Sequence, residues 1–304
     1  MVDQHLRLDS DSKPGRLRAV KLKREWVGYG LTVPAYIWLC ITVILPMIMM
    51  LYFSFLSRMP MGTAEPVLGL KQYATFFEKD FYRFLTWRSL LLGVHVTVLC
   101  GLIGYPAALV LARVVKGRWR EAILLLIVLP FWSNALIRTF AWTMVLRTDG
   151  IVDQALHFLL PGAPSMGILY SYPAIVIGLT HSFLPYMILT CYISLQTIDD
   201  SLIEAGQALG ASNITVFRRI ILPLSLPGLM VGVILTFVPV VGAFMEPRIL
   251  GGRQGFMLGT VIEDQFTEVF NWPLGAALSF MLLAIVMLIF LAAYPLLRNR
   301  LKVA

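Results

Sequence analysis

The sequence predicts an all-α, polytopic membrane protein with six transmembrane helices, and two observations lead to this fold class. The 304 residues are 58% hydrophobic and only 14% charged, far from the balance of a soluble globular domain. The apolar residues also gather into six runs of about 20 residues or more, the length that a helix needs to cross a hydrocarbon core roughly 30 Å thick. None of these runs alternates between apolar and polar residues as the strands of a membrane barrel do.

The six runs follow one another along the chain with polar segments between them. Each contains Gly or Pro among larger apolar residues, a mixture that membrane helices tolerate because neighbouring groups satisfy the freed backbone. The predicted spans are 30–55, 90–112, 122–146, 167–195, 226–250 and 274–297. They form a membrane domain over 30–297, preceded by a basic segment, 1–29, and followed by a short tail, 298–304.

The positive charge is distributed as the topology of a membrane protein requires. The formal net charge of +8 raises the question of a nucleic-acid partner. However, the N-terminal segment, the turn at 113–121, the loop at 196–225 and the tail fall on one side of six alternating spans, and they hold most of the Lys and Arg residues. The positive-inside rule therefore predicts that both termini are cytoplasmic, with membrane lipid and not nucleic acid as the partner.

The cytoplasmic loop 196–225 has a helical pattern of its own. Ser201 and Glu204 fit a capping box, and Leu202, Ala205, Gly206 and Leu209 then recur at the spacing of an amphipathic helix. Gly210 is suited to end this helix with a positive φ, Ser212 to cap a second helix, and Pro223 to close it. The periodicity leaves open whether the apolar stripe folds back on the protein's own spans or meets a partner.

The same loop carries a spaced motif. Glu204-Ala205-Gly206 is followed after three residues by Gly210, and after nine more by Ile220-Ile221-Leu222-Pro223. This resembles the EAA loop of bacterial ABC importer permeases, EAA-x3-G-x9-I-x-L-P, with Gly206 in place of the usual second Ala. The resemblance implies a type I importer permease of the MetI-like fold in a bacterial inner membrane. It also implies that the residues of this loop couple the chain to an ATPase, namely Glu204, Ala205, Gly206, Gly210, Ile220, Leu222 and Pro223.

Three further stretches narrow the resemblance. Residues 129–142, 147–151 and 244–252 look like those of the spermidine/putrescine permeases, although opine, amino-acid and ferric-ion permeases resemble this group. The resemblance implies a second permease subunit, homologous or identical, two ABC ATPase subunits and a periplasmic solute-binding protein. A secondary transporter or channel is the alternative from another class, but no clear internal repeat supports it.

The chain has no recognisable nucleotide site or catalytic centre. The segment 162–167 has the glycine spacing of a phosphate-binding loop but lacks the Lys-Ser/Thr that must follow. The four His and three Cys residues show neither metal-ligand spacing nor a catalytic arrangement. We therefore expect no catalytic or metal site, no cofactor in this chain, and ATP with its magnesium on a partner subunit.

Polar residues within the apolar runs mark a candidate substrate path, because ionisable groups at membrane depth are costly. For straight helices, the rise of 1.5 Å per residue places Asn134 about 18 Å, Arg138 about 24 Å and Glu246 about 30 Å from the inner boundary. Glu246 either binds an amine-bearing solute or pairs with Arg138 or Arg248, and His95 and His181 are expected to hydrogen-bond to adjacent helices. The candidate path comprises Trp132, Asn134, Arg138, Trp142, Phe244 and Glu246.

Overall fold

The computed structural model describes residues 32–59, 66–160, 164–165 and 167–301, and these residues are helical apart from loops and one isolated bridge between Leu56 and Leu68. The predicted basic segment 1–29 lies outside the described residues. The chain divides into two compact units, Met1–Phe53 and Ser54–Ala304. In the first unit, a helix begins at Thr32 and passes through the π-turn Cys40–Ile44 into α2, Leu45–Ser54.

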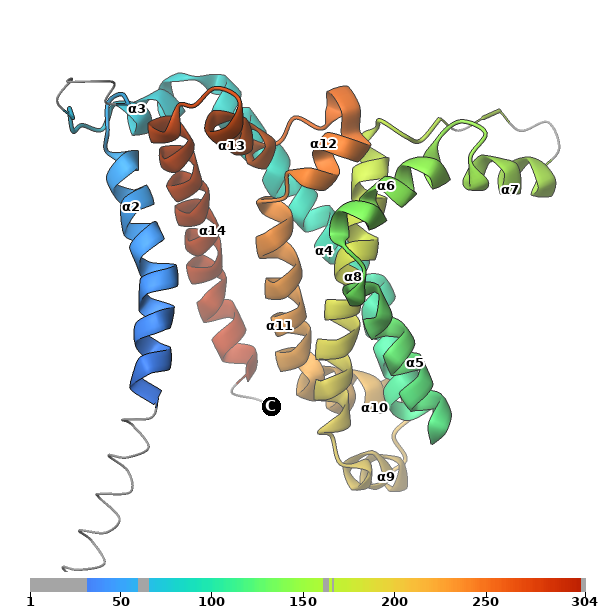
Figure 1. Cartoon of the computed structure of the whole chain (residues 1–304). Coiled ribbons are helices and arrows are strands. Elements are labelled where there is room, and N and C mark those ends of the chain that lie inside the picture. The colour runs from blue at the N-terminus through green and yellow to red at the C-terminus, as the bar shows by residue number, and fades with distance from the viewer. Residues whose placement is uncertain (1–31, 60–65, 161–163, 166, 302–304) are drawn as a thin grey trace, which may run out of the picture. The chain divides into compact units, whose positions relative to one another are not determined.

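The second unit contains the remaining helices (Figure 1). Their bounds are α3 Lys71–Glu78, α4 Asp80–Arg113, α5 Arg118–Val128, α6 Ala135–Leu146, α7 Ile151–Leu159, α8 Tyr172–Gln196, α9 Asp200–Ala208, α10 Asn213–Val216, α11 Leu222–Val241, α12 Met245–Gly251, α13 Leu258–Thr267 and α14 Trp272–Leu301. Short turns of other helical type fill Leu129–Trp132, Phe217–Ile221 and Gly252–Gln254.

Within the described residues, five helices are long and apolar enough to cross a membrane, and a bent pair supplies a sixth span if its halves count as one. The five are Thr32–Ser54, Asp80–Arg113, Tyr172–Gln196, Asn213–Val241 and Trp272–Pro295. Each overlaps one predicted span. The bent pair, which covers the predicted span 122–146, joins Arg118–Trp132 to Ala135–Leu159 at an angle of 98°.

The core of the second unit is a three-helix centre in which α4, α8 and α11 pack against one another. Apolar side chains of all three helices are fully buried there, including Leu92, Met187 and Val240. The buried Tyr105 hydroxyl of α4 lies 2.7 Å from the Ser225 hydroxyl of α11, so a polar contact adds to the apolar packing. This centre supports the loops at both ends of the spans.

Two of the predicted histidine contacts are confirmed. The His95 Nδ1 atom of α4 lies 2.8 Å from the Tyr172 hydroxyl at the start of α8. The Trp142 indole of α6 donates to His181 Nδ1 of α8 over 3.4 Å, with the two rings edge to face. Both histidines therefore connect neighbouring helices.

Candidate functional site

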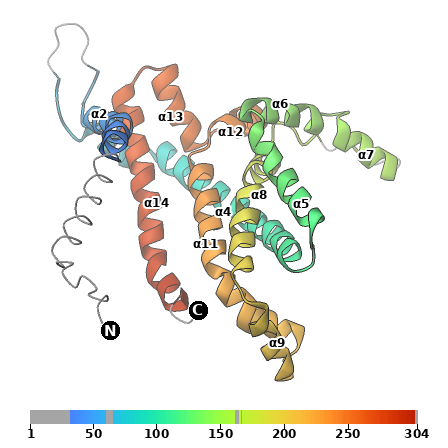
Figure 2. The same cartoon turned by 60° about the horizontal axis from the view of Figure 1, so that its bottom comes forward.

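The cytoplasmic loop folds as a short helix followed by a tight turn. Helix α9 follows α8 after three residues, and both views place it beyond the ends of α8 and α11 (Figures 1 and 2). Asp199 caps α9, since its carboxylate accepts the Ser201 backbone N–H at 2.9 Å. That backbone bond, with a further one from the Ser201 side chain, holds the pKa of Asp199 below its ordinary value. The prediction that Ser201 caps the helix in a box with Glu204 was therefore wrong, because α9 begins two residues earlier, with Asp199 and not Ser201 at its N-cap.

Gly210 ends α9 as predicted. Its φ is +81°, in the left-handed region that residues with a Cβ rarely adopt. The Gly210 N–H donates to the Gln207 carbonyl at 2.9 Å, and the Ala211 N–H donates to the Gly206 carbonyl at 3.1 Å. These two bonds form a Schellman motif, which satisfies carbonyls that the end of a helix otherwise leaves without partners.

The second half of the loop differs from the prediction in one respect. Ser212 caps the next helix as expected, because its hydroxyl accepts the Thr215 N–H. Pro223, however, does not close that helix, since a single span runs over Asn213–Val241. The π-turn Phe217–Ile221 precedes the proline and bonds the Leu222 N–H to the Phe217 carbonyl, a local adjustment of the kind that accommodates proline in membrane helices.

Some residues of the predicted apolar stripe of the loop pack within the chain, and others are exposed. Gly206 packs inward, where a Cβ would meet the Ile220 side chain at 3.0 Å. Glu204 and Ala205 are exposed, while Ile220, Leu222 and Pro223 are half-buried within the long helix. Leu209 is 89% exposed and Ile214 is 71% exposed, with Leu202 also exposed. Leu202, Ala205, Leu209 and Ile214 together form an apolar surface that the described helices leave uncovered.

The candidate substrate path begins at the break in the third predicted span. Trp132 is 85% exposed at the end of the first half. Asn134 caps α6, accepting the Leu136 N–H at 2.8 Å, and Arg138 of α6 donates back to the Pro130 carbonyl at 2.8 Å. The depth calculated for Arg138 on a straight helix is therefore wrong, because the chain turns through 98° between Trp132 and Ala135, and Asn134 lies at that turn.

Glu246 lies outside the fifth span, which ends at Val241, so its calculated depth on a straight helix is also wrong. It sits on α12, which packs against α6 and α8, and it is only 8% exposed. Burial raises the pKa of this carboxyl, and the charge of Arg138 offsets part of that rise. Glu246 forms no ion pair within the described residues: Arg248 pairs with other carboxylates, so that predicted pairing was wrong, and Arg138 acts on the Glu246 carboxyl through its charge without an ion pair.

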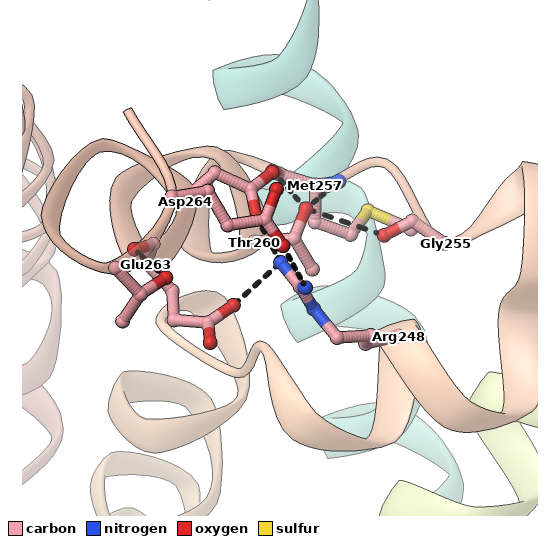
Figure 3. A network of polar contacts seen from close by, with 8 residues as sticks. Arg248, Gly255, Met257, Thr260, Glu263 and Asp264 are labelled. Atoms are coloured by element: carbon pink, nitrogen blue, oxygen red, sulfur yellow. Dashed lines mark hydrogen bonds and ion pairs between the residues drawn. The ribbon is translucent and has the colours of Figure 1, made fainter. Parts of the chain in front are cut away.

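Arg248 binds a different set of carboxylates, which sequence reasoning did not assign to it (Figure 3). Its guanidinium on α12 pairs with Glu263 and Asp264 of α13 and with Glu268, the residue that follows that helix. The hydrogen bond to Asp264 is the main cause that raises the pKa of Arg248. Three carboxylates share one cation, which ties α12 to α13 and leaves an excess of negative charge at this end of the spans.

Trp132 and Asn134 lie at the break in the third predicted span, and the structure separates the other four predicted path residues into two groups. Arg138, Trp142 and Glu246 gather where α6 and α12 meet near α8. Phe244 instead lines an apolar cavity of about 470 Å³ between α11, α13 and α14, which Glu263 also borders. The position of Glu263 beside this cavity depends on the fold of α13, and the sequence offers no spacing that would have identified it.

The comparisons with known proteins agree with this architecture. The family described as the binding-protein-dependent transport system inner membrane component matches residues 104–303. The chain is 33% identical over 268 residues to the spermidine/putrescine transport system permease protein PotB of Haemophilus influenzae, covering 87% of this chain and 93% of that protein. For the PotB of Escherichia coli K12, the identity is 35% over 257 residues, covering 84% and 92%.

Solved structures show the fold. A bacterial ABC transporter involved in the import of the acidic polysaccharide alginate contains a chain with a TM-score of 0.72 at 20% identity, covering 93% of this chain and 99% of that one. A chain of the MetNI methionine ABC transporter in an inward-facing conformation has a TM-score of 0.52 at 21% identity, covering 71% and 94%. The predicted fold class is confirmed, and the chain belongs to the family of binding-protein-dependent transport system inner membrane components.

Proposed function

We propose that this chain is a membrane permease subunit of an ATP-driven importer of polyamines. The observation that carries the proposal is the exposed apolar surface of Leu202, Ala205, Leu209 and Ile214, which we call the docking face. It lies on a loop that is capped at two positions and follows the EAA spacing in a chain of this family. Exposed apolar groups in water cost free energy unless a partner covers them. An ATPase subunit that covers this face would apply its conformational change to the ends of α8 and α11.

The substrate class rests on the relatives and on charge. The two PotB proteins, named for spermidine and putrescine, match more than four fifths of this chain. The excess carboxylates around Arg248 and the buried Glu246 provide negative charge toward the end of the spans remote from α9. Negative charge of this kind raises the local concentration of a cationic solute. An opine, an amino acid or ferric ion is less well supported as the solute.

The assembly that we propose has four other components. A second permease, homologous or identical, forms the translocation path with this chain, two ABC ATPases dock on the cytoplasmic loops, and a periplasmic binding protein delivers the solute. ATP and magnesium bind the ATPases and not this chain. Both termini face the cytoplasm of the inner membrane, since the basic loops fall on that side.

Reconstitution tests this function. The chain is co-expressed with the permease, ATPase and binding-protein subunits of the same organism, purified, and placed in liposomes loaded with ATP. We expect uptake of radiolabelled spermidine that requires both ATP and the binding protein. Uptake by the chain without ATP would instead support a secondary transporter, and competition by an opine, an amino acid or ferric ion but not by putrescine would replace the polyamine assignment.

Glu246 is proposed to contact the solute on its path. Replacing it by Gln is expected to lower the rate of spermidine uptake roughly tenfold, the loss of about 1.5 kcal/mol for one hydrogen bond to a charged group. Burial raises the pKa of the Glu246 carboxyl, because its charged form is less stable in the folded protein than in the unfolded chain. The free energy of unfolding of the wild type therefore falls as the pH rises from the ordinary pKa of the carboxyl through its pKa in the folded protein. The thermal midpoint of Glu246→Gln should therefore exceed that of wild type increasingly above pH 4.5, the ordinary value of the carboxyl.

The matched control is Glu78→Gln, which removes the same charge from an exposed position at the end of α3. This control should retain both the uptake rate and the thermal midpoint. An uptake rate of Glu246→Gln equal to that of wild type would rule out direct recognition of the solute by Glu246.

A further inference from the structure

Arg113, the last residue of α4, connects that helix to the start of the cytoplasmic loop. Its Nη2 atom donates to the Leu195 carbonyl at 2.9 Å and to the Ile198 carbonyl at 3.1 Å. Its Nη1 atom pairs with the carboxylate of Asp200, the first residue of α9. The Arg113 side chain is only 19% exposed, so solvent screens its bonds to the two carbonyls less than it would at the surface, whereas Asp200 is 79% exposed.

One guanidinium therefore serves three groups across the junction of two helices. The carbonyls near the end of α8 have no partners within that helix, and a cation is favoured there by the helix dipole. The acidic Asp200 lies in the first turn of α9, where a negative charge is favoured for the same reason. The planar fork of arginine can donate to all three at once, which a lysine ammonium cannot do with the same geometry.

A second arginine continues the connection in the other direction. Arg120 of α5 donates from Nε to the Val115 carbonyl at 2.9 Å and from Nη2 to the Ala112 carbonyl at 3.4 Å, at the end of α4. The end of α4 is thus held from both sides, by α5 through Arg120 and by the junction of α8 and α9 through Arg113. Because α4 also packs along α8 and α11, a force applied to α9 reaches the three-helix centre through it.

We propose that Arg113 is a positioning residue for transport: it locks α9 to α4, so that displacement of α9 moves the three-helix centre and does not merely bend the junction at 197–199. This inference rests on the proposed function, in which an ATPase displaces α9. Without the lock, the ATPase would still dock on α9 and hydrolyse ATP. The motion would then be lost at the junction, because only the backbone would connect α9 to α8.

The test measures spermidine imported per ATP hydrolysed by the complete transporter in liposomes. We expect Arg113→Gln to lower this ratio several-fold, Asp200→Asn to lower it less, and the double variant to match Arg113→Gln, because both changes act on one set of bonds. Arg113→Lys should recover part of the ratio, since it keeps the charge and some of the bonds. Lys116→Gln, which removes a charge from an exposed position in the same turn, is the control and should keep the wild-type ratio.

A second measurement does not depend on ATP. Hydrogen exchange of the amides in 200–208 of the full chain is expected to be faster in Arg113→Gln and unchanged in Lys116→Gln. If Arg113→Gln imports as much spermidine per ATP hydrolysed as wild type, the inference is overturned. This holds also when the yield of the variant protein is reduced, since Arg113 would then be needed for folding alone. Absence of ATP-driven uptake by the wild-type assembly would overturn the proposed function together with this inference, so the two failures are distinguishable.

Discussion

Replacing Gly210 by Pro is expected to abolish ATP-driven uptake while the protein still inserts in the membrane. The φ of +81° at this residue is incompatible with a pyrrolidine ring, which fixes φ near −65°. Proline also removes the N–H that donates to the Gln207 carbonyl, so half of the Schellman motif is lost. The turn between α9 and the long helix would rearrange, and the docking face would change its direction.

The size of this effect follows from the coupling that is lost. We assume that docking of the ATPase and opening of the pore belong to one equilibrium between two states. If the ATPase then binds the transporting state in preference to the other by about 3 kcal/mol less, the population of the transporting state falls roughly 100-fold. Spermidine uptake in liposomes measures the loss, and the amount of chain in the membrane fraction reports insertion. Gly210→Asn is the matched control, because Asn tolerates the left-handed region, and it should keep most of the uptake. Normal uptake by a correctly inserted Gly210→Pro variant would contradict the coupling role of this turn.

Leu209→Gln is expected to weaken association with the ATPase roughly 30-fold, since truncating an apolar anchor at the centre of an interface costs about 2 kcal/mol. Leu209 is almost fully exposed, so the substitution removes little packing within the chain, and its thermal midpoint should be unchanged. Gln keeps the length of the side chain and adds no charge at the end of α9. Co-purification with the ATPase subunit, measured over a range of concentrations, gives the change in affinity.

Two controls separate docking from a general effect of removing exposed apolar surface. Leu209→Met keeps an apolar side chain at the same place and should bind the ATPase as wild type does. Phe158→Gln removes an equally exposed apolar side chain at the end of α7, far from the loop in the sequence, and should leave binding unchanged. If Leu209→Gln retains wild-type affinity, the docking face is not where the ATPase binds.

The sequence predicted the parts of the structure that depend on local chemistry. Apolar run length located the spans, because every backbone group in a bilayer must be satisfied within the helix. The positive φ of Gly210 and the cap at Ser212 were also predictable, since each depends on residues within one turn of helix. The spacing of the EAA pattern then indicated a coupling loop before any contact was known.

The sequence did not predict features in which two local effects oppose each other, or in which the interacting residues belong to different helices. The run 122–146 is apolar enough for one straight span, but Pro130 and the cap of Asn134 outweigh its average hydropathy and turn the chain. At Pro223 the helix continues despite the proline, because the preceding π-turn accommodates it. The pairing of Arg248 with α13 and of Arg113 with Asp200 joins residues far apart in the chain, which no single-sequence pattern reports.

Because Asn213–Val241 is one continuous helix, the number of residues in the EAA pattern determines an angle, the direction of α9 around the axis of this helix. Each residue of an α-helix rotates the chain by about 100°, and the π-turn Phe217–Ile221 rotates it by a different amount. The number of helical residues between Asn213 and Ile220 therefore sets the direction in which α9 leaves the axis of the fifth span. One residue inserted before Leu222 would therefore rotate α9 to another position around that axis, even with every side chain of the pattern unchanged. The count of residues is therefore as much a specification of this transporter as their identity.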